Sequence, residues 1–409
     1  MYIHYNYQVI NLLLITNLIF FFIIVVLMAK LKKTNKAKKV APEGYESPND
    51  FFNSVFSDKK MIWMGQNTNH LHSDDFISNA MIKCVESKEY CKYPPPEGFP
   101  HLQNLILKDL GLEDMDILIT AGGTESLYVC ISEIVEPHHN VITCDPGYLI
   151  IDEFASRFSN EIRSIPIYNE ECGYKLTPKL LKKHMDDNTR LVILIDPLNP
   201  LGTAYTKEEI EEFALIAEEN DLYILHDITY KDFARNHFSI AKYAPNHSIT
   251  IFSFSKIFGM AGLRIGAVIT TSELIDCVRS ALINDLGTNL IAQAGAIAAL
   301  ESKPKWIDRI VNTTRSNQRL IKEMVDKIPD ISIVAYPSDG NMLAIDIEKT
   351  GINPVDLESY LLEKKIFTRR GKYTSKRFGD KYLRVSFSVP ENQLKVFIDE
   401  FPKAIEELR

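Results

Sequence analysis

The sequence predicts an α/β protein with a mainly parallel seven-stranded sheet between helices, followed by a smaller C-terminal α+β domain. Three observations lead to this prediction. Short β-branched runs alternate with amphipathic stretches between residues 117 and 270, as in a parallel sheet covered on both faces. The pattern is helical after Ser272 and mixed after Ile331. The chain has 409 residues, enough for two to three domains at roughly 100–200 residues each.

The chain begins with an apolar segment, residues 1–29, which we predict to contain a transmembrane helix. Val9 to Met28 carries no charge, and about 20 apolar residues match the thickness of a bilayer. Six lysines follow between residues 30 and 39, which puts the catalytic body of a single-pass protein in the cytoplasm. The alternative is translation from Met28, which would give a soluble cytoplasmic protein.

Residues 30–60 are polar and basic, and we interpret them as a linker and arm. Residues 61–300 form the predicted large domain. Within it, residues 61–100 contain a helix at Asp74–Lys88 and a proline-rich turn, YPPPEG. The predicted strands are Ile117–Thr120, Val141–Cys144, Ile162–Ile167, Leu191–Asp196, Leu222–Asp227, Ile249–Ser253 and Ile265–Thr270. The predicted helices are Thr124–Val135, Tyr148–Phe158, Pro178–Asp186, Lys207–Asn220, Ser272–Leu286 and Asn289–Ser302.

Residues 301–409 form the predicted small domain. Its helices are Pro304–Lys327, Pro354–Lys364 and Pro390–Leu408, and its strands are Ile331–Ala335, Met342–Ile347 and Tyr382–Phe387.

Composition excludes several classes of function. The net charge of −8 argues against nucleic acid as a partner. The six cysteines are scattered, without a CxxC pair or a Cys/His cluster at zinc spacing, so we predict no metal site.

The most specific motif is SFSKIFGMAGLRIG, from Ser253 to Gly266. Lys256 follows a predicted strand and precedes two glycines and an apolar run. Burial there would lower the pKa of the amine and free it as a nucleophile. Ser253 and Arg264 add a hydroxyl and a guanidinium that can bind the same phosphate.

Other predicted strands are also followed by residues suited to binding a ligand. These are Gly123 and Thr124 in AGGTES, Tyr148 in DPGY, Asn199 in DPLNPLGT, and Asp227 and Tyr230 in HDITY. Because ligands bind at the carboxyl ends of parallel strands, we expect these residues to form one site.

These motifs resemble the fold-type I pyridoxal-phosphate enzymes, specifically the class I/II aminotransferases, and are most similar to the histidinol-phosphate aminotransferase branch. The resemblance covers roughly Met61 to the C-terminus. It implies the fold of that family, with pyridoxal 5'-phosphate (PLP) as the cofactor. It also implies transamination between a 2-oxo acid and an L-amino acid, or a related amino compound such as histidinol phosphate. The alternative is decarboxylation, β-elimination or cyclisation of a modified amino acid on the same fold.

The resemblance also implies roles for the motif residues. Lys256 would hold PLP as a Schiff base and serve as general acid and base, and Asp227 would pair with the pyridine nitrogen. The other residues would each contact a particular part of the cofactor. They are Asn199 and Tyr230 at the phenolic oxygen, Tyr148 on the ring, and Gly123, Thr124, Ser253 and Arg264 at the phosphate.

Further residues are implied in substrate binding and in a homodimer. Arg384, in YLRVSF, would bind the substrate α-carboxylate. Asn67 lies in NTNH, where the branch has Asn-Glu-Asn-Pro, and we predict that it contacts substrate. Tyr93 would reach the phosphate of a neighbouring subunit's cofactor. Arg369 and Arg370 either bind a distal acid or phosphate of the substrate or are solvated charges in a basic loop.

Overall fold

The computed structural model describes residues 45–71, 74–282 and 284–409. The chain divides into two units, residues 1–60 and 61–409, and each is described by itself. The described part of the first unit holds helix α2 (Pro48–Ser57), in the segment that was predicted as a linker and arm. The Ser47 side chain caps α2 by accepting the Asp50 N–H at 3.1 Å.

The predicted membrane localisation is contradicted. Within residues 45–71, 74–282 and 284–409, no helix is both long enough and apolar enough to cross a bilayer. The longest described helix, α10 (Leu290–Val325), carries charged residues such as Glu301, Lys303 and Lys305 along its length. The predicted span, Val9 to Met28 in the segment 1–29, lies outside the described residues. The membrane anchor and the membrane as a partner therefore gain no support from the described residues.

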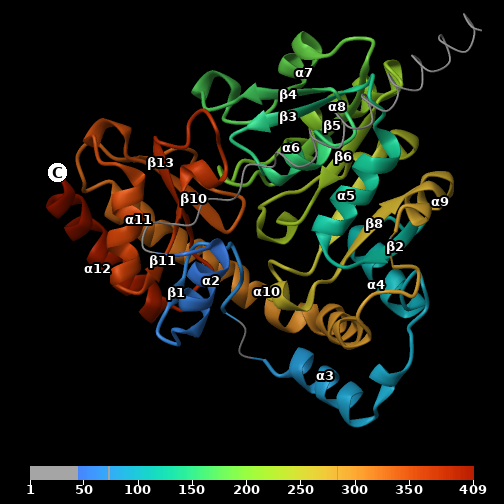
Figure 1. Ribbon diagram of the computed structural model, residues 1–409, viewed down its shortest axis with the longest axis horizontal. Helices are drawn as coiled ribbons and strands as arrows, with labels where there is room; N and C mark the ends of the chain where they lie inside the picture. The colour runs from blue at the N-terminus through green and yellow to red at the C-terminus, as the bar shows by residue number, and fades with distance from the viewer. Residues whose placement is uncertain (1–44, 72–73, 283) are drawn as a thin grey trace, which may run out of the picture. The chain divides into compact units, whose positions relative to one another are not determined.

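The second unit is built on a seven-stranded sheet, which confirms the predicted α/β class (Figure 1). Its strand order is β2-β8-β7-β6-β5-β3-β4, and β8 alone among these described strands runs antiparallel to its neighbours. The strands are β2 (Asp116–Thr120), β3 (Asn140–Asp145), β4 (Glu161–Pro166), β5 (Thr189–Ile195), β6 (Tyr223–Asp227), β7 (Ser248–Ser253) and β8 (Gly266–Thr270). All seven overlap the predicted strands.

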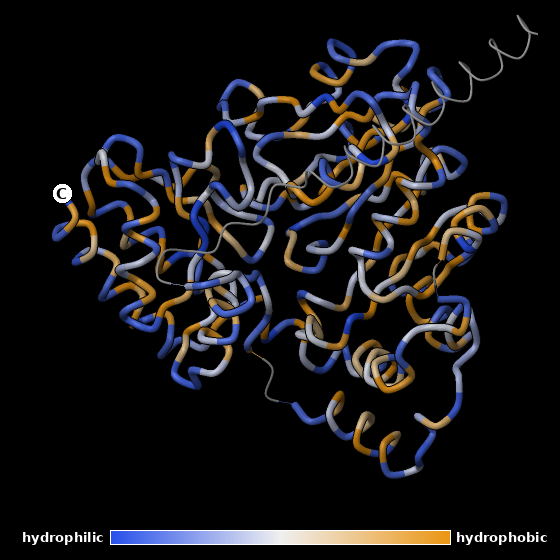
Figure 2. The backbone as a smooth tube through the Cα atoms, viewed as in Figure 1, coloured by the Kyte–Doolittle hydropathy of each residue, from blue (hydrophilic) through white to orange (hydrophobic). Residues whose placement is uncertain are grey.

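Helices cover both faces of this sheet. On β2, Leu118 packs into one core, while Ile117 and Ile119 pack into the other, because successive strand side chains point to opposite faces. Figure 2 shows hydrophobic residues gathered along the central strands and along α10. The helices and short 3-10 turns of this half are α3 (Phe76–Glu86), η1 (Glu89–Cys91), α4 (Pro100–Leu110), α5 (Gly123–Ile134), α6 (Ile150–Ala155), η2 (Glu170–Cys172), α7 (Pro178–His184), α8 (Lys207–Glu219), η3 (Lys231–Phe233), η4 (Ile240–Lys242), η5 (Pro245–His247), η6 (Ala261–Leu263) and α9 (Ser272–Ser280).

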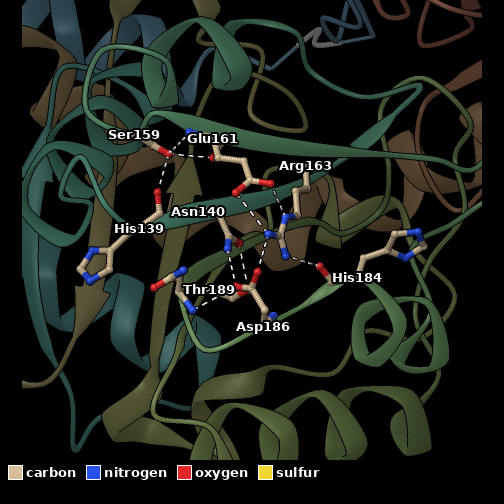
Figure 3. A network of polar contacts seen from close by, with 9 residues as sticks. His139, Asn140, Ser159, Glu161, Arg163, His184, Asp186 and Thr189 are labelled. Atoms are coloured by element: carbon tan, nitrogen blue, oxygen red, sulfur yellow. Dashed lines mark hydrogen bonds and ion pairs between the residues drawn. The ribbon is translucent and has the colours of Figure 1, made fainter.

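A polar network fixes the amino ends of β3, β4 and β5 (Figure 3). Asn140 and Thr189 begin neighbouring strands, and the Thr189 hydroxyl donates to Asn140 Oδ1 at 2.9 Å. Asp186 accepts the Asn140 amide at 2.7 Å and pairs with Arg163, which also binds Glu161. These contacts join the starts of the three strands, at the end of the sheet opposite their carboxyl ends.

The C-terminal part forms the expected smaller α+β arrangement. A four-stranded antiparallel sheet has the order β12-β13-β10-β9, and β1 pairs in parallel with β11. The helices α11 and α12 and the end of α10 pack with these strands around a third core. The elements are β1 (Ile62–Trp63), β9 (Ser332–Ile333), β10 (Met342–Asp346), η7 (Glu348–Thr350), α11 (Pro354–Glu363), β11 (Ile366–Phe367), β12 (Arg369–Arg370), η8 (Gly371–Tyr373), β13 (Tyr382–Ser386) and α12 (Glu391–Leu408).

Two helices differ from the sequence prediction. The helix α4 was not predicted. It starts at Pro100 and ends at Leu110, and it is capped by Gly111, whose φ of 62° suits glycine. The helix α10 was predicted as two helices but runs through Pro304. Burial of Trp306 and Ile310 beyond the proline offsets the backbone hydrogen bond that it removes.

Candidate active site

The carboxyl ends of several strands meet at a cavity of about 330 Å³. Apart from Tyr93, every residue to which the resemblance assigns a cofactor or substrate contact lines it. These residues are Asn67, Gly123, Thr124, Tyr148, Asn199, Asp227, Tyr230, Ser253, Lys256, Arg264 and Arg384. They come from the loops after β1, β2, β3, β5, β6 and β7 and from β13, so the cavity joins the large sheet to the C-terminal part.

Lys256 lies at this cavity, just after β7. Its Nζ donates to the carbonyl oxygen of Gln66 at 3.0 Å and lies 5.7 Å from the centre of the Tyr230 ring. Burial and the guanidinium groups of Arg384 and Arg264 lower the pKa of Lys256 to about 7, although Asp227 opposes this shift. The amine is thus partly neutral near pH 7, as a nucleophile or a proton carrier requires.

Asp227 is the last residue of β6 and is 6% exposed. Its Oδ1 accepts the backbone N–H of Thr229 at 3.0 Å. Burial raises the pKa of the carboxyl group, and the charge of Lys256 partly offsets this effect. A buried acid facing a cavity is suited to binding a cationic nitrogen of a ligand.

An anion cradle forms where β2 leads into α5. Gly122 precedes the helix with a φ of 89°, and a Cβ atom there would come within 2.7 Å of an Arg264 nitrogen. The first helical residues, Gly123 and Thr124, present backbone N–H groups without partners inside the helix. Ser253 and Arg264 line the same cavity. The cradle therefore combines a helix N-terminus, a hydroxyl and a guanidinium.

Asn67 connects two other site residues. Its amide nitrogen donates to Asn199 Oδ1 at 3.3 Å and to the Tyr230 hydroxyl at 3.2 Å. Arg384 also donates to Asn199 Oδ1, at 2.8 Å, and to the carbonyl oxygen of Gly65. Arg384 is 3% exposed, and burial lowers the pKa of its guanidinium.

Tyr148 and Thr124 both line the cavity. Burial raises the pKa of the Tyr148 hydroxyl, so it remains a neutral hydrogen-bonding group. Its ring is available as an aromatic wall for a planar ligand.

Three predicted positions have different surroundings. Tyr93 lies outside the cavity with 78% of its surface exposed. Arg369 lines the cavity, with its guanidinium 4.2 Å from the centre of the Tyr373 ring. Arg370 does not line it and pairs with Glu358 at 3.7 Å.

Sequence reasoning missed several cavity residues. Gln66, Thr68, Thr229 and Tyr373 also line it. Gln66 contributes a backbone carbonyl, which any residue could supply, so no sequence signal exists for it. Tyr373 lies three residues from Arg370 in the basic loop, which was the one available indication.

The fold and the cavity together define an α/β enzyme with a buried, partly deprotonated lysine, a facing carboxyl group and an anion cradle. A sequence model of the family "Aminotransferase class I and II" matches residues 59–401. The chain therefore belongs to this family. Its members are enzymes that use PLP to transfer an amino group between an amino acid and a 2-oxo acid.

Individual proteins agree with this assignment. The chain is 27% identical over 328 residues to an aspartate aminotransferase of Pyrococcus horikoshii, covering 77% of this chain and 83% of that protein. It is 27% identical over 305 residues to histidinol-phosphate aminotransferase 2 of Archaeoglobus fulgidus, covering 74% and 83%. A Thermus thermophilus aspartate aminotransferase variant has the same fold, with a TM-score of 0.75, 22% identity and coverage of 83% and 95%.

Proposed function

We propose that the residues of this cavity carry out transamination and that each has a distinct role in it. The observation that carries the proposal is the buried Lys256, whose pKa of about 7 suits both covalent attachment of PLP and proton transfer. Bound PLP supplies an electron sink for the reacting carbon of the substrate. Lys256 would take a proton from that substrate carbon and deliver it to the cofactor carbon that receives the amino group.

The other residues would bind and orient PLP. Asp227 keeps the pyridine nitrogen protonated, and this cation offsets the cost of burying the carboxylate. Asn199 and Tyr230 donate hydrogen bonds to the phenolic oxygen. Tyr148 packs on the ring.

The cradle fits the phosphate of PLP. Gly123 and Thr124 donate backbone N–H groups, Ser253 donates its hydroxyl, and Arg264 supplies the charge that balances the phosphate. Arg264 has a φ of 52° and donates to the Ala261 carbonyl at 2.9 Å, which holds its guanidinium beside Gly122.

We infer that the substrate is an amino acid or amine with a second, anionic group. Arg384 would bind the α-carboxylate, and Asn67 would close the cavity over the substrate. Arg369, held against the Tyr373 ring at 4.2 Å, supplies a second cation for a distal carboxylate or phosphate. The similar proteins carry names for both kinds of substrate, aspartate and histidinol phosphate.

We also propose a homodimer in which Tyr93 reaches the phosphate of the partner's cofactor. Several apolar side chains near Tyr93 in the sequence are exposed, including Tyr90, Ile82 and Val85. Exposed apolar residues of this kind are typical of an interface between subunits. The large domain is proposed to span residues 61–300 and the small domain residues 301–409.

The test is a half-reaction monitored by the absorbance of bound PLP. Aspartate, glutamate, histidinol phosphate and aromatic amino acids are added one at a time without an acceptor. We expect an anionic donor to convert PLP to its amine form and a 2-oxo acid to reverse the change. Lys256→Ala should abolish the conversion, whereas Lys395→Ala, at an exposed position of α12, should leave it unchanged.

Two outcomes would contradict the proposal. If no donor changes the spectrum, these residues do not carry out transamination. The assignment of a second anionic group to the substrate is wrong if two results are found together. Only donors without a distal carboxylate or phosphate react, and the Arg369→Gln variant reacts with them as the wild type does.

A further inference from the structure

Three side chains able to bind a metal meet behind the strand that carries Asp227. Asp196 follows β5, His226 lies in β6, and His237 lies in the loop after η3. His226 Nε2 is 3.3 Å from Asp196 Oδ2, and His237 Nε2 is 3.2 Å from the same oxygen. None of the three lines the cofactor cavity. They form a separate cluster, because neighbouring residues of a strand point to opposite faces.

The negative charge of the buried Asp196 carboxylate requires a neutralising cation. The side chains of Asp196 and His226 are both 0% exposed. Among the described residues, the ion pairs of Asp196 are with these two histidines, and none involves lysine or arginine. Asp196 also accepts the Tyr205 N–H at 3.2 Å. A fully buried carboxylate is costly unless a cation neutralises it, so either a protonated imidazole or a metal ion must do so.

The spacing of the three groups is compatible with a metal ion, although His226 Nε2 and Asp196 Oδ2 are also within hydrogen-bond distance. In a tetrahedral zinc site with ligands at about 2.0–2.1 Å, neighbouring ligand atoms are roughly 3.3 Å apart. The two nitrogen–oxygen distances here are 3.3 and 3.2 Å. His237 Nε2 is buried and forms no hydrogen bond despite its closeness to the carboxylate. With the ring proton on Nδ1, this nitrogen would offer a lone pair to a shared ion.

The surroundings also permit a metal to enter. The His237 side chain is 13% exposed, whereas the other two are fully buried. The two imidazole rings are nearly parallel, at 15° with centroids 5.4 Å apart. The three ligand atoms all lie within 4.8 Å of one another.

We propose that Asp196, His226 and His237 bind one divalent transition-metal ion of the zinc class, with water as the fourth ligand. Two imidazole nitrogens and one carboxylate oxygen are a ligand set that zinc accepts. The backbone N–H of Asp196 donates to the carbonyl oxygen of Asp227 at 2.8 Å. The bound ion would therefore fix the backbone behind Asp227. This site does not depend on the assigned roles of the cavity residues.

The test measures metal content in the full-length protein with PLP bound. The protein is stripped with a chelator, dialysed, loaded with Zn²⁺ and analysed by elemental mass spectrometry. A parallel sample is loaded with Co²⁺, whose visible absorption reports tetrahedral coordination. We expect one ion per chain. His237→Ala should weaken binding by more than the ~10–100-fold that loss of an outer-shell partner costs.

Two further variants test whether a metal ion or a protonated imidazole neutralises Asp196. His237→Gln retains an N–H donor for Asp196 but removes the imidazole ligand, so it should also lose the ion while remaining folded by circular dichroism. His138→Ala, at a side chain 65% exposed, should bind like the wild type. A wild-type chain without stoichiometric zinc would overturn the proposal, as would His237→Ala and His237→Gln variants that both bind zinc as tightly as the wild type.

Discussion

Two buried lysines show how the surroundings of a single residue decide its chemistry. Lys256 is buried near two guanidinium groups, and its pKa is lowered to about 7. Lys231 is also buried, but Asp232 and Asp109 hold its pKa well above the ordinary value. Lys231 is therefore a permanent cation in an ion-pair cluster, whereas Lys256 can lose its proton near neutral pH.

The lowered pKa of Lys256 predicts a pH dependence for capture of PLP by the cofactor-free protein. The neutral amine is the nucleophile, so the rate should rise with pH through about 7 and then level off. Arg384→Gln removes a charge that lowers the pKa, so the midpoint should move to higher pH. Stopped-flow absorbance measures this rate.

A control separates this effect from a general change in charge. Arg409→Gln, at the end of the chain, should leave the midpoint where it is in the wild type. A wild-type midpoint close to the ordinary lysine value would show that the amine is not electrostatically activated.

At the scale of elements, the cradle depends on the close approach of β8 to the start of α5. A Cβ atom on Gly266 would lie 2.8 Å from Gly123 N and 2.7 Å from the carbonyl oxygen of Phe252. Both are backbone atoms, so an added methyl group forces the strand and the loop apart. The sequence motif places this glycine two residues after Arg264.

Gly266→Ala should therefore weaken PLP binding. Overpacking costs about 1–3 kcal/mol, which corresponds to roughly a 10–100-fold loss of affinity. Gly262→Ala is the matched control, because a Cβ atom there meets nothing within 4 Å. Fluorescence titration of the cofactor-free proteins measures both affinities, and equal values would contradict the role given to this close approach.

Local sequence patterns predicted most of these elements but not their interruptions. The seven strands were recognisable because each is a short β-branched run bounded by turn residues. The unbroken α10 was not predicted, since Pro304 is a helix-ending signal locally and only the tertiary burial of Trp306 overrides it. The site residues were predictable where each directly follows a strand.

Contacts between residues far apart in the sequence could not be predicted from local sequence patterns. Asp196 and His226 meet because β5 and β6 are neighbours, with Leu194 paired to His226 in the register. Their spacing of 30 residues matches no metal-binding motif. The sequence presented Arg369 and Arg370 as equivalent candidates. The fold distinguishes them, because Arg369 lines the cavity whereas Arg370 pairs with Glu358.

At the scale of the whole molecule, the role proposed for the exposed Tyr93 predicts that the active site is complete only in a dimer. Tyr93→Phe should weaken PLP binding by roughly 10–100-fold, since a hydrogen bond to a charged group contributes about 1.5–3 kcal/mol. Tyr90→Phe, at another exposed tyrosine nearby, is the control. Unchanged affinity in Tyr93→Phe would argue against a shared site.

Mixed subunits give an independent measure. Chains with Tyr93→Phe and chains with Lys256→Ala are combined, so that one site of each mixed dimer has an intact Lys256 and receives Tyr93 from its partner. We expect the mixture to regain activity at PLP concentrations where neither variant is active alone. Absence of recovery, with dimers present by light scattering, would show that Tyr93 does not act across the interface.

The pairing of β1 with β11 also bears on how the protein is made. Ile62 pairs with Ile366, and the Met64 carbonyl accepts the Ser386 N–H at 2.7 Å. The ribosome releases the early partners long before the late ones, so Ile62 and Met64 lack their native neighbours during most of translation. The third core can close only when nearly the whole chain has emerged. A nascent chain stalled before residue 366 would therefore expose this apolar segment to chaperones.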